Sequence, residues 1–497
     1  MKYISTRNKK IKLESAEAIK KGLSAEGGLF VPEEIPVLSE TEINDLVGKT
    51  YIQRANAILK KFLTDFTGTE ISACTRGAYG TGFSSKKVAP VVKLKDNKYI
   101  LELWHGPTCA FKDMALQILP RFMTTAMKKT GEDKKIVILV ATSGDTGKAA
   151  LEGFKNVKGT EIIVFYPAEG VSDIQKLQMM TQEGKNVYVS GIEGNFDDAQ
   201  SGVKTIFTDD KYGKKLNQSG YALSSANSIN WGRLVPQIVY YISAYCDMLE
   251  SNEIEMGEKI NVCVPTGNFG NILAAYYARK MGLPINKLIC ASNQNNVLTD
   301  FIKTGEYDKN RPFYQSVSPS MDILISSNLE RLLFDICDCD DKKVADMMKK
   351  LNSDGVYKLD KELHDKITDV FWGGFCDDYF TKTQIWKTFN DTGYTLDTHT
   401  AVAVDVYEQY VKETGDTTKT VIASTASPFK FNEAVLSALG EETNGLSDFE
   451  MIEKLEKKSG FETPKSLAEL KDKEKIFDGV INKNDMQDLV SNILKVK

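Results

Sequence analysis

The sequence contains few of the residues that build metal sites. Three histidines occur in 497 residues, and the eight cysteines include no CxxC pair. Cys337 and Cys339 are the closest cysteines, and a CxC spacing with a single histidine in the region that follows does not match a structural zinc site. We therefore expect no metal, and we expect the thiols to be reduced and mostly buried.

Long apolar runs and an excess of basic residues are missing as well. No uninterrupted apolar stretch approaches the roughly 18–20 residues that a membrane span requires. The net charge of −5 argues against a nucleic-acid-binding surface. The N-terminal segment "MKYISTRNKKIKLESAEAIKKG" has no apolar core of a signal peptide. These absences predict a cytoplasmic protein with no nucleic-acid and no membrane partner.

The residues that are present are typical of a soluble globular protein, with 42% hydrophobic and 26% charged residues. A chain of this length exceeds one ordinary core, so we expect more than one domain. Residues 1–95 are expected to form a largely helical N-terminal domain, because apolar residues recur at steps of three and four over residues 42–66. The Gly- and Ser-rich stretch 75–87 indicates a boundary or a moving loop.

Beyond residue 95, short apolar runs alternate with helical patterns. The expected strands cover residues 135–140, 161–166, 186–190, 259–264, 287–292 and 419–424. This alternation predicts an α/β fold whose parallel strands are covered on both faces. Residues 96–497 are expected to form the core, with a smaller α/β subdomain nested at about 135–240 and a helical excursion at about 320–390.

Three unusual loops follow directly on predicted strands, namely "ATSGDTG", "PTGNFGN" and "STASP". Ligands of open α/β sheets bind at the carboxyl ends of the strands, so these loops predict one shared site. In "PTGNFGN", Gly267 and Gly270 permit close backbone approach, and a helix is expected to begin near Asn271. Such a loop offers backbone N–H groups to a phosphate. A plain strand-to-helix turn is the alternative.

The loop "ATSGDTGKAA" (141–150) is not a P-loop, because a Walker motif requires glycine where Thr142 stands. The hydroxyls of Thr142, Ser143 and Thr146 and the amides around Gly144 instead offer donors for a carboxylate or another small anion.

Lys112 lies between Phe111 and Asp113, before a helical pattern that Pro120 must kink or interrupt. Desolvation and a helix N-terminus would lower the pKa of its amine, which is the state required for attack on an aldehyde. A solvated charge at a helix start is the alternative. An activatable lysine, a phosphate loop and an anion-binding loop together fit pyridoxal 5′-phosphate acting on an amino acid. In this interpretation the Thr425 hydroxyl faces the pyridine nitrogen.

These motifs occur in the order found in a known family. The blocks "LWHGPTCAFKD", "SANSINWGRL", "VPTGNFGNILAAYYA", "GYTLDTHTAVA" and "STASPFKF" resemble those of threonine synthase of the longer type, within the tryptophan-synthase-β-like group of enzymes. The similarity runs from near residue 3 past residue 432. It implies the pyridoxal-phosphate-dependent fold type II, with two doubly wound α/β domains and mostly parallel sheets.

The resemblance implies a role for each motif. Lys112 would be the Schiff-base lysine and the catalytic base, and Thr425 the partner of the pyridine nitrogen. Asp145 stands where many relatives have an asparagine beside the 3′-oxygen of the cofactor. The cofactor phosphate would be held by Gly267, Asn268, Phe269, Gly270 and Asn271. The substrate would be held by Thr142, Ser143, Thr146, Asn227, Ser228, Asn230 and Arg233, with Arg233 on its phosphate.

The implied reaction converts O-phospho-L-homoserine and water to L-threonine and phosphate, in a monomer or a homodimer. The leaving phosphate is itself implied to assist, so His105 and His399 are interpreted as hydrogen-bonded structural residues. Two alternatives remain open. One is a phospho-lyase or dehydratase that releases 2-oxobutyrate from the same scaffold, and the other is a non-catalytic relative that binds amino acids or anions.

Overall fold

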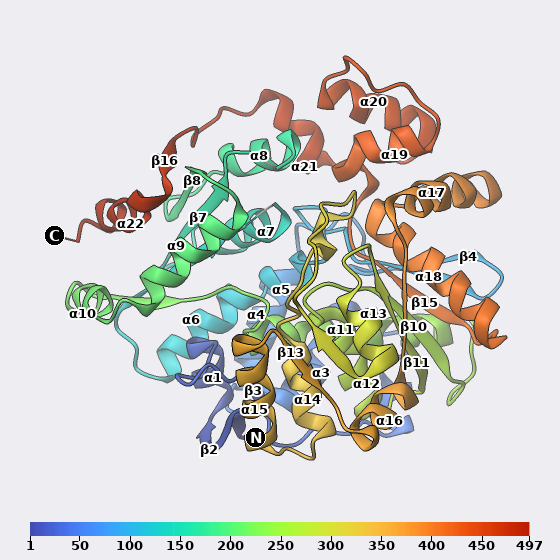
Figure 1. Cartoon of the computed structure of the whole chain (residues 1–497), viewed down its shortest axis with the longest axis horizontal. Coiled ribbons are helices and arrows are strands. Elements are labelled where there is room, and N and C mark those ends of the chain that lie inside the picture. Colours follow the sequence, from blue (N-terminus) through green and yellow to red (C-terminus); the bar gives the residue numbers. More distant parts are fainter. Residues whose placement is uncertain (143, 170, 497) are drawn as a thin grey trace.

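The computed structural model describes residues 1–142, 144–169 and 171–496 of the chain. Two mostly parallel sheets with helices packed around them dominate the molecule (Figure 1). The predicted α/β class is confirmed, and all six predicted strands form. The strands at 135–140, 161–166 and 186–190 lie in the smaller sheet, within the range of the expected subdomain at about 135–240, and the other three lie in the larger sheet.

The larger sheet has six strands, of which only the edge strand β4 runs antiparallel to its neighbour. In order across the sheet they are β14 (Phe371–Phe375), β11 (Ile285–Ser292), β10 (Ile260–Pro265), β15 (Thr420–Ser424), β5 (Lys98–Glu102) and β4 (Val91–Lys95). The helical excursion expected at about 320–390 also contains two strands, β13 (Val356–Lys358) and β14. The sequence of β14, "FWGGF", contains two glycines and no alternation of apolar and polar residues, so it carries no strand signal.

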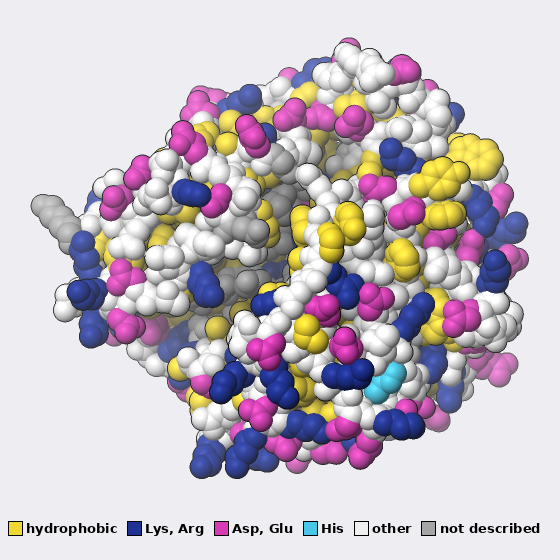
Figure 2. Space-filling view, in the orientation of Figure 1, with side chains coloured by type: hydrophobic (Ala, Val, Ile, Leu, Met, Phe, Trp, Pro, Cys, Tyr) yellow, Lys and Arg dark blue, Asp and Glu magenta, His cyan; other side chains and the backbone are white. Residues whose placement is uncertain are grey.

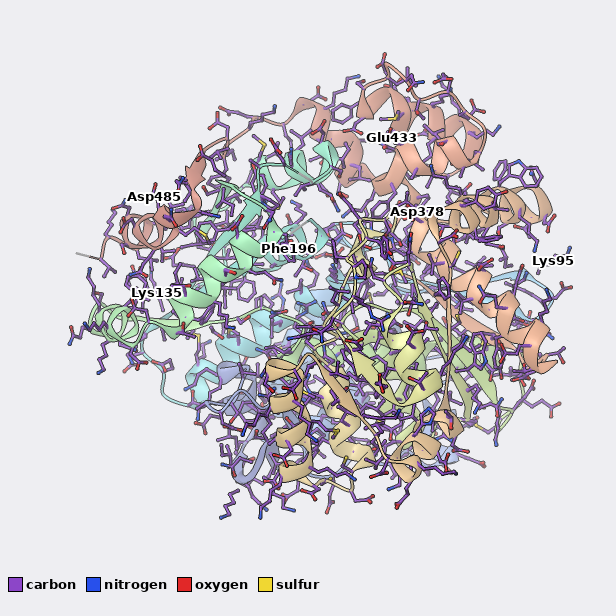
Figure 3. The ribbon with its side chains drawn as sticks, in the orientation of Figure 1. Lys95, Lys135, Phe196, Asp378, Glu433 and Asp485 are labelled. Carbon is purple, nitrogen blue, oxygen red and sulfur yellow. The ribbon has the colours of Figure 1, made fainter. Side chains whose placement is uncertain are left out.

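The smaller sheet has five parallel strands. Across it lie β16 (Val480–Asn482), β8 (Val187–Glu193), β7 (Thr160–Pro167), β6 (Lys135–Ala141) and β9 (Tyr221–Ser224). Its helices are α7 (Asp145–Phe154), α8 (Asp173–Met180), α9 (Phe196–Thr208) and α10 (Asp210–Gln218). The edge strand β16 and the following α22 (Met486–Leu494) come from the C-terminus, so Asp485 and Lys135 lie at the same end of the molecule (Figure 3).

Both sheets are covered on both faces. Successive residues of each strand point to opposite sides of its sheet, and the apolar residues on each side pack against helices. In β10, Val262 packs into a core with α11 (Trp231–Glu250) and α12 (Gly270–Lys280), while Cys263 packs against α18 (Thr398–Thr414). Alternate residues of β6 and β7 join the same core as Val262. The other side of the small sheet packs against α9 and α22. One apolar core therefore connects the two sheets.

The N-terminal part combines helices with a small sheet. It contains strands β1 (Tyr3–Ser5), β2 (Asn8–Leu13) and β3 (Phe30–Pro32), and helices α1 (Ser15–Lys21), α2 (Glu40–Leu46), α3 (Tyr51–Phe62) and α4 (Gly68–Tyr79). Since α4 continues to Tyr79, the Gly- and Ser-rich stretch begins inside a helix. The boundary expected at residue 95 also differs from the structure, because β4 already belongs to the larger sheet.

The remaining elements connect the sheets or cover their outer faces. They are α5 (Asp113–Leu116), α6 (Leu119–Lys129), α13 (Val297–Thr304), β12 (Glu306–Asp308), α14 (Leu329–Ile336), α15 (Asp341–Ser353), β13 (Val356–Lys358), α16 (Lys361–Val370), α17 (Asp378–Thr392), α19 (Asn432–Ala438), α20 (Asp448–Ser459) and α21 (Lys465–Ala468). Pro120 interrupts the pattern as predicted, at the beginning of α6. In the part of the chain that the structure describes, no helix is long and apolar enough to cross a membrane.

Candidate active site

The segment that carries Lys112 is fixed to the end of β15 by backbone contacts. Phe111 donates its N–H to the carbonyl of Thr425 at 2.8 Å, and Ala110 and Ala426 form an antiparallel bridge. Loops of both sheets converge around this segment. On the outside, a hollow opens beside a strap of chain that crosses the centre of one face (Figure 2).

Lys112 has the properties expected of a nucleophilic amine. Burial lowers its pKa to about 8, the charge of Asp145 raises it, and the charges of Arg233 and Lys430 lower it. The adjoining α5 has only four residues, so burial rather than a helix dipole is the main cause. Among the described residues, no hydrogen bond or ion pair engages the Lys112 ammonium. The amine is therefore free to react.

The loop between β10 and α12 presents unpaired backbone donors. Among the described residues, none accepts a hydrogen bond from the backbone N–H groups of residues 267–271. Phe269 adopts a left-handed conformation with φ of 63°, which turns the chain into α12. A Cβ at Gly267 would lie 2.8 Å from the carbonyl oxygen of Ser320, so this position requires glycine. Successive free N–H groups at a helix N-terminus are suited to bind a phosphate.

The side chain of Asn271 and the backbone carbonyl of Asn268 have structural partners. Asn271 accepts hydrogen bonds from Tyr240 at 2.6 Å and from Tyr241, so its amide points toward α11. The backbone N–H of Asn271 remains the donor that a phosphate can use. The carbonyl of Asn268 accepts from the N–H of Asn328 at 3.1 Å and from its amide at 3.0 Å. These contacts hold the loop in shape.

The Thr142 hydroxyl is used within its own loop. It accepts the N–H groups of Gly144 and Gly147, each at 3.0 Å, and donates to the Gly144 carbonyl at 3.1 Å. This bonding favours a loop-shaping role for Thr142 over a contact with substrate. Thr146 is partly exposed and is available as a donor. Ser143, also predicted as a substrate contact, lies outside the described residues.

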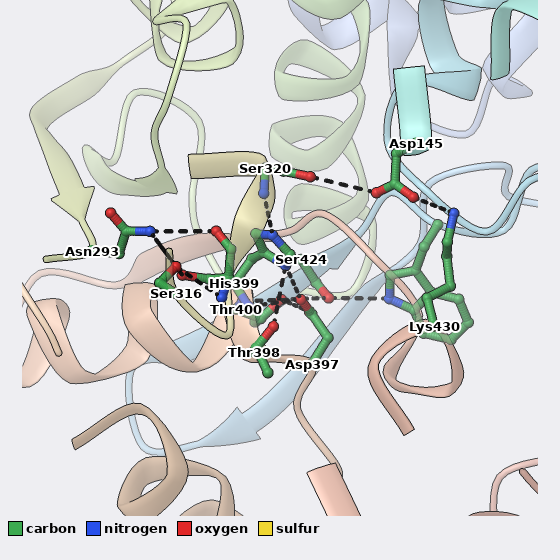
Figure 4. A network of polar contacts seen from close by, with 12 residues as sticks. Asp145, Asn293, Ser316, Ser320, Asp397, Thr398, His399, Thr400, Ser424 and Lys430 are labelled. Atoms are coloured by element: carbon green, nitrogen blue, oxygen red, sulfur yellow. Dashed lines mark hydrogen bonds and ion pairs between the residues drawn. The ribbon is translucent and has the colours of Figure 1, made fainter. Parts of the chain in front are cut away.

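Asp145 begins α7 and is buried between residues of three different segments. It accepts a hydrogen bond from the Gln175 amide at 3.0 Å. It also pairs with the Lys430 ammonium and faces the Ser320 hydroxyl at 3.5 Å (Figure 4). Burial raises the pKa of its carboxyl, but the Lys430 and Lys112 charges and the hydrogen bonds from Lys430 and Gln175 lower it well below the usual range. Asp145 is therefore a carboxylate with a fixed orientation.

Lys430 is a site residue that the sequence reasoning missed. It belongs to the motif "STASPFKF", and its side chain has no exposed surface. Its ammonium donates to the Thr108 carbonyl at 3.1 Å as well as pairing with Asp145. A lysine between Phe429 and Phe431, just after a buried strand, is the signal that would have indicated a buried charge.

Arg233 lies in the first turn of α11 with part of its guanidinium unpaired. Its Nη1 donates to the Ala226 carbonyl at 2.5 Å, while its Nε is buried without a partner among the described residues. Burial lowers its pKa to about 10, so the side chain is charged at neutral pH. The charge of Arg233 lowers the pKa of the Lys112 amine. A buried guanidinium with an unpaired N–H donor is suited to bind an anionic group of a ligand.

The other polar residues of "SANSINWGRL" differ in their availability. Asn230 caps α11, because its Oδ1 accepts from the Gly232 N–H at 2.8 Å and its amide donates to the Ile19 carbonyl at 2.9 Å. This leaves Asn230 as a structural residue. Asn227 is exposed and Ser228 is partly exposed, and both remain candidates for substrate contact.

Both histidines near the motifs are held by hydrogen bonds. His399 accepts the Ser320 N–H at Nε2 over 3.1 Å, and its Nδ1 lies 3.0 Å from the Asp397 carboxylate (Figure 4). His105 contacts the Ser84 hydroxyl at 2.8 Å and the Glu102 carboxylate at 2.7 Å. These contacts support the structural interpretation. Within the described residues no group of three or more side chains is placed to hold a metal ion.

Together these groups match what pyridoxal 5′-phosphate requires. The unpaired N–H groups at 267–271 provide a phosphate anchor, and Lys112 provides a free amine. The Thr425 hydroxyl, close to Lys112 through the backbone contact with Phe111, has no partner among the described residues and is available for a ring nitrogen. The residues present therefore fit the cofactor.

Comparison with known families gives three matches along the chain. A sequence model described as "Threonine synthase N terminus" matches residues 2–79. One described as "Pyridoxal-phosphate dependent enzyme" matches residues 87–357, more than half of the chain. One described as "Threonine synthase, C-terminal" matches residues 400–493.

Individual relatives agree with these matches. A threonine synthase of Pseudomonas aeruginosa is 38% identical over 439 residues, which cover 88% of this chain and 90% of the relative. "Threonine synthase-like 1" of Homo sapiens is 44% identical over 434 residues, which cover 85% of this chain but only 58% of that protein. This chain therefore spans little more than half the length of the latter.

Solved structures share the fold over the whole chain. The pyridoxal-phosphate-bound threonine synthase of Brucella melitensis superimposes with a TM-score of 0.88 at 36% identity, covering 100% of this chain and 99% of that one. The threonine synthase from yeast gives a TM-score of 0.89 at 33% identity, covering 99% and 98%. The predicted cofactor, pyridoxal 5′-phosphate, and fold type II are thereby confirmed. The chain belongs to the threonine synthase family of pyridoxal-phosphate-dependent enzymes.

Proposed function

We propose that the chain is a lyase that converts O-phospho-L-homoserine and water to L-threonine and phosphate, the last step of threonine biosynthesis. The observation that carries the proposal is the juxtaposition of an unpaired amine, Lys112, with a second anion site at Arg233 that is separate from the backbone donors at 267–271. One site suits the cofactor phosphate, and the other suits a phosphate on the substrate. We also propose that the enzyme is cytoplasmic and a monomer or homodimer.

When bound, pyridoxal 5′-phosphate supplies a conjugated electron sink for the carbon atoms next to the substrate amino group. The chain supplies the proton transfers. With a pKa of about 8, the Lys112 amine can accept a proton at Nζ near neutral pH and return it later. The partial burial of Lys112 limits access of water to this proton.

Arg233 would hold the substrate phosphate and keep it close after it leaves. Its guanidinium is buried, charged and partly unpaired, so it stabilises the doubly charged leaving group without first breaking a strong protein contact. Asn227, Ser228 and Thr146 are the remaining candidates for substrate contacts. Lys112 is the proposed catalytic residue and, with Asp145 and Thr425, would contact the cofactor when it is bound.

The test supplies O-phospho-L-homoserine to the cofactor-loaded protein and quantifies threonine, 2-oxobutyrate and phosphate. We expect threonine and phosphate in equal amounts, and neither from Lys112→Ala. 2-Oxobutyrate as the sole organic product would replace the proposal with a phospho-lyase or dehydratase. The match to a protein named "Threonine synthase-like 1" is the reason to carry this alternative. A protein that takes up no cofactor would instead indicate a non-catalytic binding relative.

A further inference from the structure

Lys430 is a fully buried lysine whose location calls for an explanation. Its side chain has no exposed surface, and its ammonium contacts the Thr108 carbonyl and the Asp145 carboxylate. Taking an ammonium group out of water costs several kcal/mol unless a well-placed partner compensates. A buried ion pair is a weak source of stability, because apolar residues of similar volume often serve as well. A role at the site is the stronger explanation.

The carboxylate that Lys430 engages is the one that acts on Lys112. Asp145 raises the pKa of the Lys112 amine, whereas burial, Arg233 and Lys430 lower it. Asp145 is held toward Lys430 by a hydrogen bond from Gln175 and by its position at the start of α7. No ion pair joins Asp145 to Lys112 in the described part of the chain. One carboxylate thus lies between two lysines and is paired with only one of them.

Thr108 links this pair to the residue that follows Lys112. Its N–H and hydroxyl donate to the Asp113 carboxyl, each at 2.8 Å, while its carbonyl accepts from Lys430. Asp113 itself is fully buried, and its pKa is raised to about 7 by burial, against the hydrogen bonds from Thr108. The Lys430 ammonium is therefore fixed by the same backbone turn that fixes Lys112.

We propose that Lys430 is a positioning residue that keeps the Asp145 carboxylate in an ion pair of its own, so that the Lys112 amine stays neutral and available as a nucleophile. This inference rests on the proposed role of Lys112 in the reaction. Without the Lys430 charge, Lys112 is the other lysine whose charge acts on the Asp145 carboxylate. A carboxylate facing an ammonium in a dry pocket favours the protonated amine, which cannot attack a carbonyl. The charge of Arg233 also lowers the pKa of the Lys112 amine.

The test measures the protonation of Lys112 in cofactor-free protein. Brief labelling with acetic anhydride acetylates neutral amines, and peptide mass spectrometry gives the labelled fraction of Lys112. The labelling is repeated at pH values from below about 8 to above 10.5, so that the midpoint of the titration can be determined. Exposed Lys49 in the same digest is the internal standard. For the wild type we expect a midpoint near 8. For Lys430→Met we expect a midpoint at least one unit higher, and for Lys430→Arg a midpoint close to that of the wild type.

A double-mutant cycle separates the proposed route from direct repulsion between the two lysines. If Lys430 acts through Asp145, the shift caused by Lys430→Met falls to less than half in the Asp145→Asn background. Equal shifts in both backgrounds would overturn the proposal, as would no shift in Lys430→Met. Lys148→Met is the matched control. Lys148 lies on α7, as Asp145 does, but its ammonium contacts Glu152 and Gln182 and not Asp145. The Lys112 midpoint of this variant should equal that of the wild type.

The labelling also distinguishes failure of this inference from failure of the proposed function. The Lys112 midpoint is read without cofactor or substrate, whereas the reaction is judged by its products. Far-ultraviolet circular dichroism of each variant shows whether it has folded. Where Lys430→Met alone fails to fold, Lys430→Gln takes its place in both the wild-type and the Asp145→Asn background, because it removes the charge and keeps a neutral donor for the Thr108 carbonyl.

Discussion

At Lys112, burial lowers the pKa of the amine and has the largest effect, the charge of Asp145 raises it, and the charges of Arg233 and Lys430 lower it further. The nitrogen becomes neutral about two to three pH units below an ordinary lysine, since the pKa falls from 10.5 to about 8. The amine therefore gains its reactivity from where the fold places it. The sequence indicated an unusual lysine at this position but gave no information on the charges around it, because those come from Asp145, Arg233 and Lys430 on other elements.

The rate of cofactor uptake should report this shift. We expect the rate at which cofactor-free protein binds pyridoxal 5′-phosphate covalently to rise with pH, to reach half its maximum near pH 8 and to level off above it. The sign follows because only the neutral amine attacks an aldehyde and its fraction grows as pH passes the pKa. Stopped-flow absorbance measures the rate, with free Nα-acetyl-lysine as the reference. A half-maximum near 10.5 would mean that Lys112 is an ordinary, solvated lysine.

Arg233 should determine the affinity for the phosphorylated substrate. Losing a charge-assisted hydrogen bond to a buried group costs about 1.5–3 kcal/mol, or roughly 10- to 100-fold. Arg233→Met is therefore expected to raise KM for O-phospho-L-homoserine by that factor and to weaken inhibition by inorganic phosphate in parallel. Arg76→Met, which removes an exposed arginine of α4, should change neither. An unchanged phosphate affinity in Arg233→Met would assign the substrate phosphate to other residues.

Secondary-structure elements were more predictable than their grouping. Runs such as "KIVILV" and "KINVCV" have the β-branched composition of buried strands, and the structure has strands there. The pattern could not show that β16 from the C-terminus pairs with β8, or that β15 lies between β10 and β5, because strand neighbours are chosen by packing. The resemblance implied that Asn230 binds substrate, whereas in the structure it caps α11 and donates to the Ile19 carbonyl, a contact that depends on how distant segments pack.

The loop before α12 offers a prediction at the scale of an element. In Gly267→Ala the new Cβ would lie 2.8 Å from the Ser320 carbonyl oxygen and 3.3 Å from the Met321 Cα, so backbone must move. Such overpacking costs about 1–3 kcal/mol. We expect the dissociation constant of the cofactor to rise by about 5- to 150-fold. Gly270→Ala is the control, because its Cβ would approach only the Asn328 amide at 3.4 Å. Fluorescence titration measures both variants, and equal constants would contradict a tight fit at Gly267.

At the scale of the whole molecule, the C-terminus joins the two sheets. After α20 and α21 the chain crosses to the small sheet, where the Phe477 N–H donates to the Met180 carbonyl at 3.0 Å. Strand β16 then pairs with β8, and α22 packs on α9. Since the site takes loops from both sheets, their relative placement decides whether Asp145 reaches Lys430. The C-terminal strand and helix are thus part of what keeps the site assembled.

Deleting residues 476–497 should loosen the small sheet while leaving the larger one intact. The deletion removes four buried apolar side chains, Met486, Val490, Leu494 and Val496, each worth about 1.5–3 kcal/mol as an upper estimate, and it exposes the edge of β8. Hydrogen exchange read by mass spectrometry should show faster exchange in β8 and α9, with β10 and α12 unchanged.

Two point variants sharpen this experiment. Val490→Asp places a charge in the α9–α22 contact and should reproduce the local effect without shortening the chain. Lys483→Met removes only a surface ion pair with Asp198, worth about 0–1 kcal/mol, and should leave exchange as in the wild type. Uniformly faster exchange across both sheets in Val490→Asp would show that they unfold as one unit. Cofactor affinity should fall together with protection of β8, because α7 and Asp145 belong to the sheet that loosens.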